Sequence, residues 1–357
     1  MPMRVIEVLD GGLFTTVQDL GRVGYQRYGV AVSGAMDRFA IRAGNRLVGN
    51  GDGAAGLELT MMGPELRFGE TMTIAVTGAD LGPILDGRPA PMWRAVAVRA
   101  GAVLSFAGPR DGLRAYLTVR GGINVPPVLG SRSTSTRSTL GGFEGRTLRA
   151  GDVLRVATAQ GGRTAAARPM PQTAIPVYGH DHAVRVVLGP QDDAFSDAGI
   201  ETFQSVGYTM TPQSDRIGCR FQGAPVTHRI SADIVSDGTT MGMVQVSGDG
   251  MPIVLMADCG TTGGYTKIAT VVTADLSKLA QAAPGDRVHF HRIDLESAVG
   301  LLREQEEILD AITAPAETRP AGPSEDVYDE DAGGPLAGGA YEDLADALEG
   351  TGLEREQ

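Results

Sequence analysis

Short apolar runs bounded by turn residues dominate the hydrophobic pattern of this chain. The runs are rich in the β-branched and aromatic side chains that fit a pleated sheet, and most are shorter than a typical helix. Glycine (50 residues) and proline (20 residues) punctuate the sequence between them. The pattern therefore predicts a mainly β protein of sandwich or barrel architecture. The expected strands lie in MTIAVTG, RAVAVRAG, AVLSFAG, LRAYLTVRGG, AVRVVLGP, GMVQVSG, PIVLMAD, KIATVVTAD and DRVHFHRID.

Three segments place apolar residues at helical spacing instead. The first covers residues 34–50, and Ser33 is expected to cap its N-terminus. The second is the short segment ADLSKLAQ, with Asp275 as the expected cap. The third is the longest and runs over about residues 294–312, where one apolar stripe indicates a helix that packs against a core.

Composition divides the chain into four parts. Residues 1–158 and 179–312 carry the strand-like runs, and each is expected to form one β domain. Residues 159–178 are rich in small residues and proline without periodicity, which is typical of a linker. Residues 313–357 contain twelve acidic residues against two arginines. Such a segment buries too little apolar surface to fold, so we expect a disordered acidic tail.

The charge balance restricts the possible partners. The formal net charge is −12, but residues 313–357 carry −10 of it, which leaves −2 for residues 1–312. A nearly neutral domain pair offers no broad basic field for a phosphate backbone, so no nucleic acid partner is expected. The sequence contains no apolar run of membrane-spanning length, and its start lacks the basic and apolar segments of a signal peptide. We therefore expect a cytoplasmic protein that does not enter a membrane.

Common metal-binding and nucleotide-binding patterns do not fit this sequence. Cys219 and Cys259 lack metal-like spacing and are expected to be free thiols. The histidine pairs at 180/182 and 289/291 lack a third ligand at recognisable spacing, so no metal site is expected. In the glycine-rich segment DCGTTGGYTK, lysine follows threonine, and isoleucine stands where a phosphate-binding loop needs a hydroxyl. That segment is therefore not a nucleotide-binding loop.

Four polar clusters set arginine or lysine beside glycine and hydroxyl residues. Guanidinium forks and exposed backbone N–H groups bind carboxylates and other anionic oxygens, so the clusters predict a shared cleft for an anionic or amide-like ligand. An alternative for the third cluster is a local pair between Arg216 and Asp215. The clusters are TVQDLGRVGYQRYGVAVSGAMD (16–37), LGSRSTSTRSTLGGFEGR (129–146), QSDRIGCRFQG (213–223) and DCGTTGGYTK (258–267).

These clusters and other motifs occur in an order that resembles one family. It includes allophanate hydrolase subunit 2, the C subunit of the bacterial ATP-dependent 5-oxoprolinase, and part of the carboxyltransferase region of urea carboxylase. The resemblance covers roughly residues 4–292 and implies two cyclophilin-like β-barrel domains. Further motifs that carry it are NRLVGN, LELTMMGPELRF, YLTVRGGI, GPQDDAF and IVSDGTTMGMVQV.

The sequence departs from the family pattern at two positions of the glycine-rich segment. Family members usually have proline where this chain has Thr266, and often glutamine where it has Gly260. Proline stiffens a loop, so its absence bears on how rigid this segment is. Lys267 and Lys278 are the two lysines of the chain, and neither stands in the methionine-flanked setting typical of biotin attachment. We therefore expect no biotin on this chain, and ATP to be bound with or by partner subunits.

The resemblance implies an enzyme subunit of hetero-oligomeric type. The leading hypothesis is a 5-oxoprolinase that opens the lactam of 5-oxo-L-proline to L-glutamate together with subunits A and B. One alternative is a carboxyltransferase that receives CO₂ from carboxybiotin on another chain and passes it to urea or a related amide. A second alternative is a regulatory subunit without turnover, since some relatives antagonise an inhibitor of a sporulation kinase.

The candidate site residues come from the four clusters. Lys267, Arg22 and Arg132 are expected to bind carboxylate, phosphoryl or developing oxyanion groups, and Asp258 and Asp215 to orient those cations. The expected catalytic set is Lys267, Asp258 and Tyr265. The expected substrate-binding set is Arg22, Ser33, Arg132, Ser133, Asp215, Arg216, Thr261, Thr262, Gly263 and Gly264.

Overall fold

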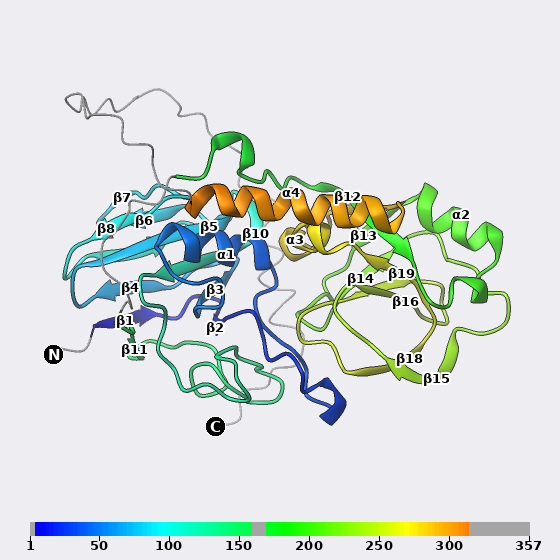
Figure 1. Cartoon of the computed structure of the whole chain (residues 1–357), viewed down its shortest axis with the longest axis horizontal. Coiled ribbons are helices and arrows are strands. Elements are labelled where there is room, and N and C mark those ends of the chain that lie inside the picture. The colour runs from blue at the N-terminus through cyan, green and yellow to red at the C-terminus, as the bar shows by residue number, and fades with distance from the viewer. Residues whose placement is uncertain (1–3, 159–168, 314–357) are drawn as a thin grey trace.

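The computed structural model describes residues 4–158 and 169–313 (Figure 1). Part of the expected linker and the expected acidic tail lie outside these residues. Strands dominate the described part, so the predicted mainly β class is confirmed. Each of the nine runs expected to be strands contains one.

The first half of the chain forms two antiparallel sheets. One has six strands in the order β11-β1-β4-β9-β6-β7, and the other has five in the order β2-β3-β10-β5-β8. Alternation sets which side chains enter the core between them: in β4, Leu66 and Phe68 are buried while Glu65 and Arg67 are exposed. The strands are β1 (Val5–Asp10), β2 (Phe14–Gln18), β3 (Gly56–Thr60), β4 (Glu65–Phe68), β5 (Met72–Asp80), β6 (Pro83–Leu85), β7 (Arg88–Pro89), β8 (Val96–Val98), β9 (Val103–Phe106), β10 (Asp111–Val119) and β11 (Val153–Arg155).

The second half forms a closed seven-stranded barrel in the order β12-β19-β16-β17-β14-β13-β20. Its core includes a stacked aromatic pair, Phe203 and Phe290, whose ring centroids are 4.7 Å apart. A separate two-stranded ribbon, β15 with β18, stands outside the barrel. The strands are β12 (Asp181–Leu188), β13 (Gly207–Met210), β14 (Gly218–Gln222), β15 (Asp233–Gly238), β16 (Met243–Val246), β17 (Pro252–Leu255), β18 (Thr262–Tyr265), β19 (Lys267–Val271) and β20 (Arg287–Arg292).

The three expected helices are present; of the two expected caps, Ser33 is wrong and Asp275 occupies the N-cap position of its helix. Asp37, not Ser33, caps the first helix: its carboxylate accepts a hydrogen bond from the N–H of Ala40 at 2.9 Å. Asp275 makes no capping hydrogen bond, because Arg185 occupies its carboxylate. The sequence pattern missed a fourth helix. The helices are α1 (Arg38–Leu47), α2 (Asp197–Ser205), α3 (Leu276–Gln281), α4 (Leu295–Thr313) and the short 3-10 turns η1 (Gln26–Tyr28), η2 (Gln172–Ala174), η3 (Asp192–Ala194) and η4 (Thr273–Asp275).

Helix α4 leaves the barrel and lies across the first half of the chain (Figure 1). Leu309 and Ile312 are fully buried in a core that also contains Phe39 of α1. Arg42 of α1 donates two 2.6 Å hydrogen bonds to the carboxylate of Glu306. The boundary at residue 312 stays a prediction, but the last helix clearly joins both halves. Among the described residues, no helix is both long enough and apolar enough to cross a membrane.

A buried amide bridges the two halves. The side-chain oxygen of Gln281 in α3 accepts hydrogen bonds from the N–H groups of Leu113 (3.1 Å) and Arg114 (2.8 Å) in β10. Its amide nitrogen donates to the carbonyl of Arg114 and to Asp37, both at 2.9 Å. All four hydrogen-bonding positions of this amide are thus used, which fixes α3 against β10.

A buried ion pair forms the second bridge. Arg216, in the loop before β14, donates to Asp258 Oδ2 at 2.8 Å from Nε, to Glu58 of β3 from Nη1, and to the carbonyl of Gly34 at 2.7 Å from Nη2. Burial alone lowers the pKa of Arg216, but the charges of Glu58 and Asp258 outweigh it and raise that pKa above its ordinary value. One cation therefore ties carboxylates from both halves together.

We predict that Gln281→Ala lowers stability by about 2–4 kcal/mol, because two buried N–H groups of β10 lose their acceptor. Urea unfolding followed by circular dichroism measures the shift in midpoint. Gln213→Ala is the matched control, since this glutamine is exposed in a loop. An unchanged midpoint for Gln281→Ala would show that the amide bridge does not hold the halves together.

We also predict that Arg216→Met lowers stability by about 3–5 kcal/mol, because Glu58 and Asp258 stay buried without their cation. Urea midpoints of the variant and the wild-type chain test this, and an unchanged midpoint would contradict it.

Candidate functional site

Asp19 joins the first two polar clusters. Its carboxylate accepts hydrogen bonds from the hydroxyls of Ser131 (2.6 Å) and Ser133. It also accepts from the N–H groups of Gly21 (2.8 Å) and Arg132 (2.6 Å). One carboxylate therefore fixes the loop after β2 against the loop that starts at residue 129. The expectation that these two clusters meet is fulfilled, and Ser133 serves the scaffold of the site.

Arg22 stands in this scaffold with unused donors. Its side chain is 1% exposed, and Nη2 donates to the carbonyl of Ser133. Its Nε and Nη1 have no hydrogen-bond partner among the described residues. Burial lowers the pKa of Arg22, while the nearby charges of Asp19 and Asp258 act in the opposite direction. Buried donors without partners are costly, so an anionic ligand is the kind of group that would satisfy them.

An open groove of about 670 Å³ lies between the two halves of the chain. Gln26, Arg27 and Gly29, in and next to η1, form one side. Residues 238–240 and the predicted Thr261 and Thr262 form the other. The predicted Gly263, Gly264 and Tyr265 follow in β18, where Tyr265 is 37% exposed. The glycine-rich segment is thus one strand of the ribbon that walls the groove, rather than a bare turn.

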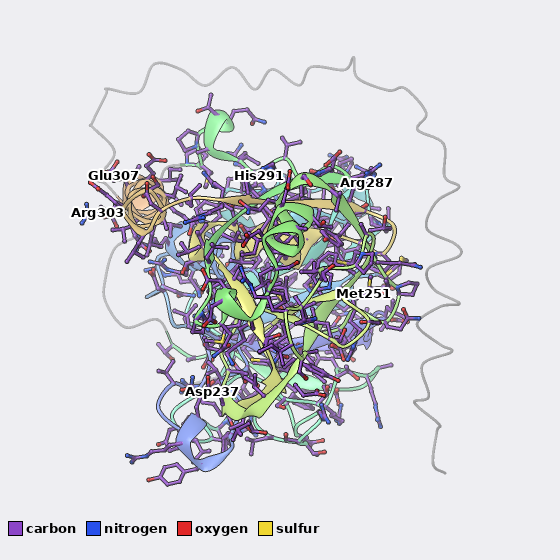
Figure 2. The ribbon with its side chains drawn as sticks, turned by 90° about the vertical axis from the view of Figure 1, so that its right-hand side faces the viewer. Asp237, Met251, Arg287, His291, Arg303 and Glu307 are labelled. Carbon is purple, nitrogen blue, oxygen red and sulfur yellow. The ribbon has the colours of Figure 1, made fainter. Side chains whose placement is uncertain are left out.

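Lys267 lies at the base of the same ribbon. It begins β19, its side chain is 0% exposed, and Nζ is 3.2 Å from Asp237 Oδ2. This contact is an ion pair without well-aligned hydrogen-bond geometry, so Nζ has no hydrogen-bond partner among the described residues. The amide nitrogen of Gln245, which lies opposite Lys267 in β16, is also unpartnered within those residues. Asp237 (Figure 2) is half exposed and directly precedes the groove residue Gly238. It therefore lies between this buried amine and the edge of the groove.

Gly263 is required by the close packing of this base. A side chain at this position would collide with the amide of Gln245 and approach Thr239. The glycine therefore lets the ribbon lie directly on the barrel strand that faces Lys267.

Two predicted site residues have other roles in the structure. Asp215 is exposed and accepts hydrogen bonds from the N–H groups of Ile217 (2.8 Å) and Gly218 (3.0 Å), so it shapes a turn and orients no cation. Arg216 pairs with Glu58 and Asp258, so the alternative pairing with Asp215 is wrong, and the donors of Arg216 are not free for the expected substrate-binding role. Asp258 remains next to the site, because its charge acts on Arg22.

Three further positions complete the comparison with the sequence. Arg132 donates from Nε to the carbonyl of Val125 at 2.9 Å and is half-buried. Ser33 is fully buried with a positive φ of 56°, and its hydroxyl has no partner in the described part of the chain. Thr266 is buried, and its N–H donates to the carbonyl of Ala232 at 2.9 Å, a bond that proline cannot make. Threonine at this position therefore still anchors the segment.

Sequence reasoning did not select four residues that build the site: Asp19, Glu58, Asp237 and Gln245. All four lie in motifs that carry the family resemblance, namely QDLG, LELT and IVSDGTTMGMVQV. Their types alone are common in turns and strands. For Glu58 and Gln245 the informative signal is burial of an acid or amide within a strand, which only the tertiary structure reveals. Asp19 lies in a loop and Asp237 is half exposed, so neither carries this signal. Within the described residues, no three potential metal ligands converge.

The chain matches a family model and named proteins over most of its length. Residues 28–292 match the model of the carboxyltransferase domain, subdomain A and B. The chain is 38% identical to the C subunit of 5-oxoprolinase from Haemophilus influenzae over 309 residues, which is 86% of this chain and 97% of that protein. It is 36% identical to the C subunit of 5-oxoprolinase from Escherichia coli, over 85% of this chain and 96% of that protein.

A solved structure agrees with this assignment. The crystal structure of the Kluyveromyces lactis urea carboxylase superimposes with a TM-score of 0.83 at 32% identity. The match covers 87% of this chain and 29% of that larger chain. The fold and the resemblance first seen in the motifs are therefore confirmed, and the chain belongs to the carboxyltransferase domain family that comprises subdomains A and B.

Proposed function

We propose that this chain is the C subunit of a 5-oxoprolinase, active in a complex with subunits A and B. The observation that carries the proposal is the 36–38% identity to two proteins of that name across 96–97% of their length. The groove between the two halves supports a small substrate. Lys267 and Arg22 do not line the groove, but both carry buried donors without partners among the described residues, and these donors support an anionic or amide-like ligand. We propose the lactam 5-oxo-L-proline as that substrate.

The residues of this chain supply donors where charge develops. Opening a lactam places negative charge on the amide oxygen, and preorganised donors at that oxygen lower the barrier most. Lys267 Nζ and the free N–H groups of Arg22 are already desolvated, so they need little reorganisation when charge appears. Asp237 orients the amine, while Asp19 and Asp258 place negative charge beside the guanidinium.

We propose that ATP is bound with or by the partner subunits. The glycine-rich segment enters strands β18 and β19, whereas a phosphate-binding loop leads into a helix N-terminus. The two lysines of the chain are also poorly placed for covalent attachment of biotin. Lys267 is buried, and Lys278 donates to the carbonyl of Ala183 at 2.7 Å, so neither amine stands on an exposed hairpin.

One specific observation favours a second candidate, amide carboxylation with CO₂ delivered by another chain. The fold matches the K. lactis urea carboxylase closely. The same buried cations suit a carboxyl group as well as an oxyanion. Co-expression with the neighbouring subunits separates the candidates: 5-oxoproline-dependent ATP hydrolysis supports the first, and turnover of urea with a biotinylated partner supports the second. A regulatory protein without turnover would show neither.

We predict that Lys267→Met lowers turnover of 5-oxoproline in the reconstituted complex by about 100-fold or more, because a donor to the developing charge is lost. Methionine keeps the apolar stem of the side chain, and gel filtration checks that the complex still assembles. Arg220→Met is the control, since its side chain is exposed at the barrel surface. Wild-type turnover of an assembled Lys267→Met complex would remove Lys267 from the mechanism.

We predict that Arg22→Met lowers turnover by about 10-fold to 100-fold while the urea midpoint of the chain stays the same or rises. The reason is that Nε and Nη1 of the buried Arg22 have no partner among the described residues, so replacing the guanidinium by an apolar group removes the cost of burying a charge. Arg137→Met, at an exposed position of the second cluster, should change neither quantity. A large loss of stability would assign Arg22 to the scaffold instead of the site.

A further inference from the structure

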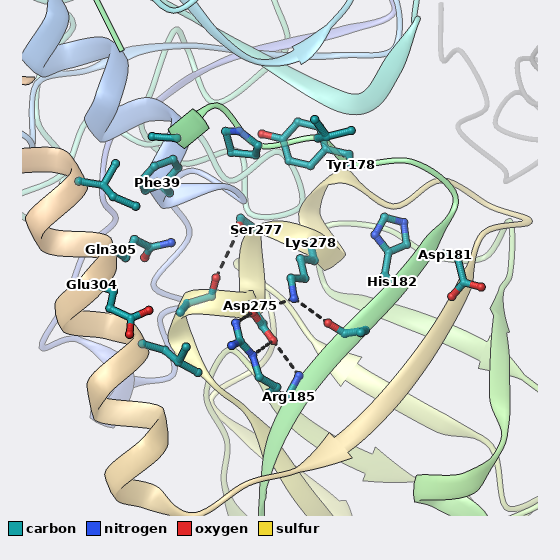
Figure 3. Close-up of a pocket in the computed structure, with 17 residues that line it drawn as sticks. Phe39, Tyr178, Asp181, His182, Arg185, Asp275, Ser277, Lys278, Glu304 and Gln305 are labelled. Atoms are coloured by element: carbon teal, nitrogen blue, oxygen red, sulfur yellow. Dashed lines mark hydrogen bonds and ion pairs between the residues drawn. The ribbon is translucent and has the colours of Figure 1, made fainter. Parts of the chain in front are cut away.

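A second cavity, of about 460 Å³, lies between α3, α4, β12 and the segment 174–178 (Figure 3). We call it the α3–α4 cavity. It shares no lining residue with the groove, and neither Arg22 nor Lys267 lines it. Its volume is in the range of small-molecule sites. The proposed reaction makes no use of it.

One side of this cavity carries an excess of positive charge. Asp275, which is 0% exposed, accepts hydrogen bonds from Arg185 at 2.8 Å (Nε) and 2.6 Å (Nη2) and lies 3.1 Å from Lys278 Nζ. Two cations thus share one carboxylate. Their side chains stay 32% and 36% exposed, so both face the cavity. Nη1 of Arg185 has no hydrogen bond to any described residue, and this side can accept one further negative group.

The opposite side carries an unpaired carboxylate. Glu304 extends from α4 toward this cationic side (Figure 3). It forms no hydrogen bond or ion pair with any residue in the described ranges. Hydrogen bonds to Asp275 raise the pKa of Arg185 most, and the charge of Glu304 adds to that rise, so the carboxylate lies close enough to act on the cation. A ligand that carries both charges would pair with both sides at once.

The remaining wall is apolar. Phe39 from α1 and Leu301 and Ile308 from α4 line it, with Pro176 from the connecting segment. An apolar group placed here would be removed from water at a gain of roughly 25 cal/mol for each Å² buried.

From this arrangement we propose that the α3–α4 cavity binds an α-amino acid with an apolar side chain. The ligand carboxylate pairs with Arg185 and Lys278, its ammonium pairs with Glu304, and its side chain lies against Leu301 and Ile308. A zwitterion fits because Arg185 and Lys278 lie on one side of the cavity and Glu304 on the other. Asp181 also lines the cavity, where its Oδ1 lies 3.3 Å from His289 Nε2.

The cavity also touches the bridge between the two halves. Tyr178 lines it, and the tyrosine hydroxyl lies 3.4 Å from Asp37 Oδ2, which also accepts from Gln281. A bound amino acid would therefore brace the junction of α3 and α1. Because the ligand binds only the folded chain, it raises the temperature of unfolding.

Isothermal titration of the purified full-length chain tests the proposal, with L-leucine and L-phenylalanine as probes. N-acetyl-L-leucine removes the ammonium group, and L-leucinamide removes the carboxylate. We expect saturable binding of the free amino acids, a rise in melting temperature, and loss of binding for both blocked forms. Glu304→Gln should weaken binding about tenfold, because one charged contact is lost. Glu307→Gln is the control, since Glu307 is exposed on the same helix and does not line the cavity (Figure 2).

Three results would overturn the proposal. The first is no saturable binding of either amino acid. The second is equal binding of the blocked and free forms, which would mean that the cavity does not recognise a zwitterion. The third is equal affinity of Glu304→Gln and the wild-type chain. The experiment needs neither partner subunits nor turnover, so its failure is distinct from a failure of the proposed 5-oxoprolinase function.

Discussion

The buried contact of Arg216 with Glu58 and Asp258 sets the geometry on which the site depends. Glu58 belongs to the sheets of the first half, and Arg216 and Asp258 to the second half; Glu58 and Arg216 are separated by 158 positions in the sequence. A buried ion pair contributes little net stability compared with apolar packing, but it fixes one relative position of its partners strongly, because any other position leaves a charge unpaired. The groove between η1 and the β15–β18 ribbon exists only in that position.

Two buried arginines show how the same side chain takes opposite roles. Arg216 has partners for all three of its nitrogens and is part of the scaffold. Arg22 has a single acceptor among the described residues and two free nitrogens. The pKa values of the two side chains shift in opposite directions for the same reason. Nearby carboxylates outweigh burial and raise the pKa of Arg216, whereas burial outweighs the nearby carboxylates and lowers the pKa of Arg22. A buried guanidinium with unsatisfied donors is tolerated where a ligand supplies the missing acceptors. This agrees with the proposed role of Arg22 in stabilising developing negative charge.

The bridge between the halves also reaches the α3–α4 cavity. Asp37 caps α1, accepts from Gln281 of α3, and lies next to the hydroxyl of Tyr178. Tyr178 lines the α3–α4 cavity, while Glu58 hydrogen-bonds the hydroxyl of Tyr116 and pairs with Arg216. Because each of these groups is buried, none can lose its partner without cost. A change at the cavity therefore acts on the network that joins the two halves.

The sequence by itself determined the local elements and the chemistry that was available. Alternating apolar runs depend on neighbours two residues apart, so nine of the twenty strands in the described residues were predictable, and so were three of the four α-helices there. The clusters of arginine, glycine and hydroxyl residues marked segments that meet in the fold, the first two at Asp19 and the first and fourth along the groove. Only the tertiary structure decided which charges meet: Asp37 displaced Ser33 as the cap, Asp258 displaced Asp215 as the partner of Arg216, and Asp19 joined two loops. Whether a charged side chain binds a ligand or stabilises the fold depends on partners that, for Arg216, lie more than 40 residues away in the sequence. Local sequence patterns contain no information about such distant contacts.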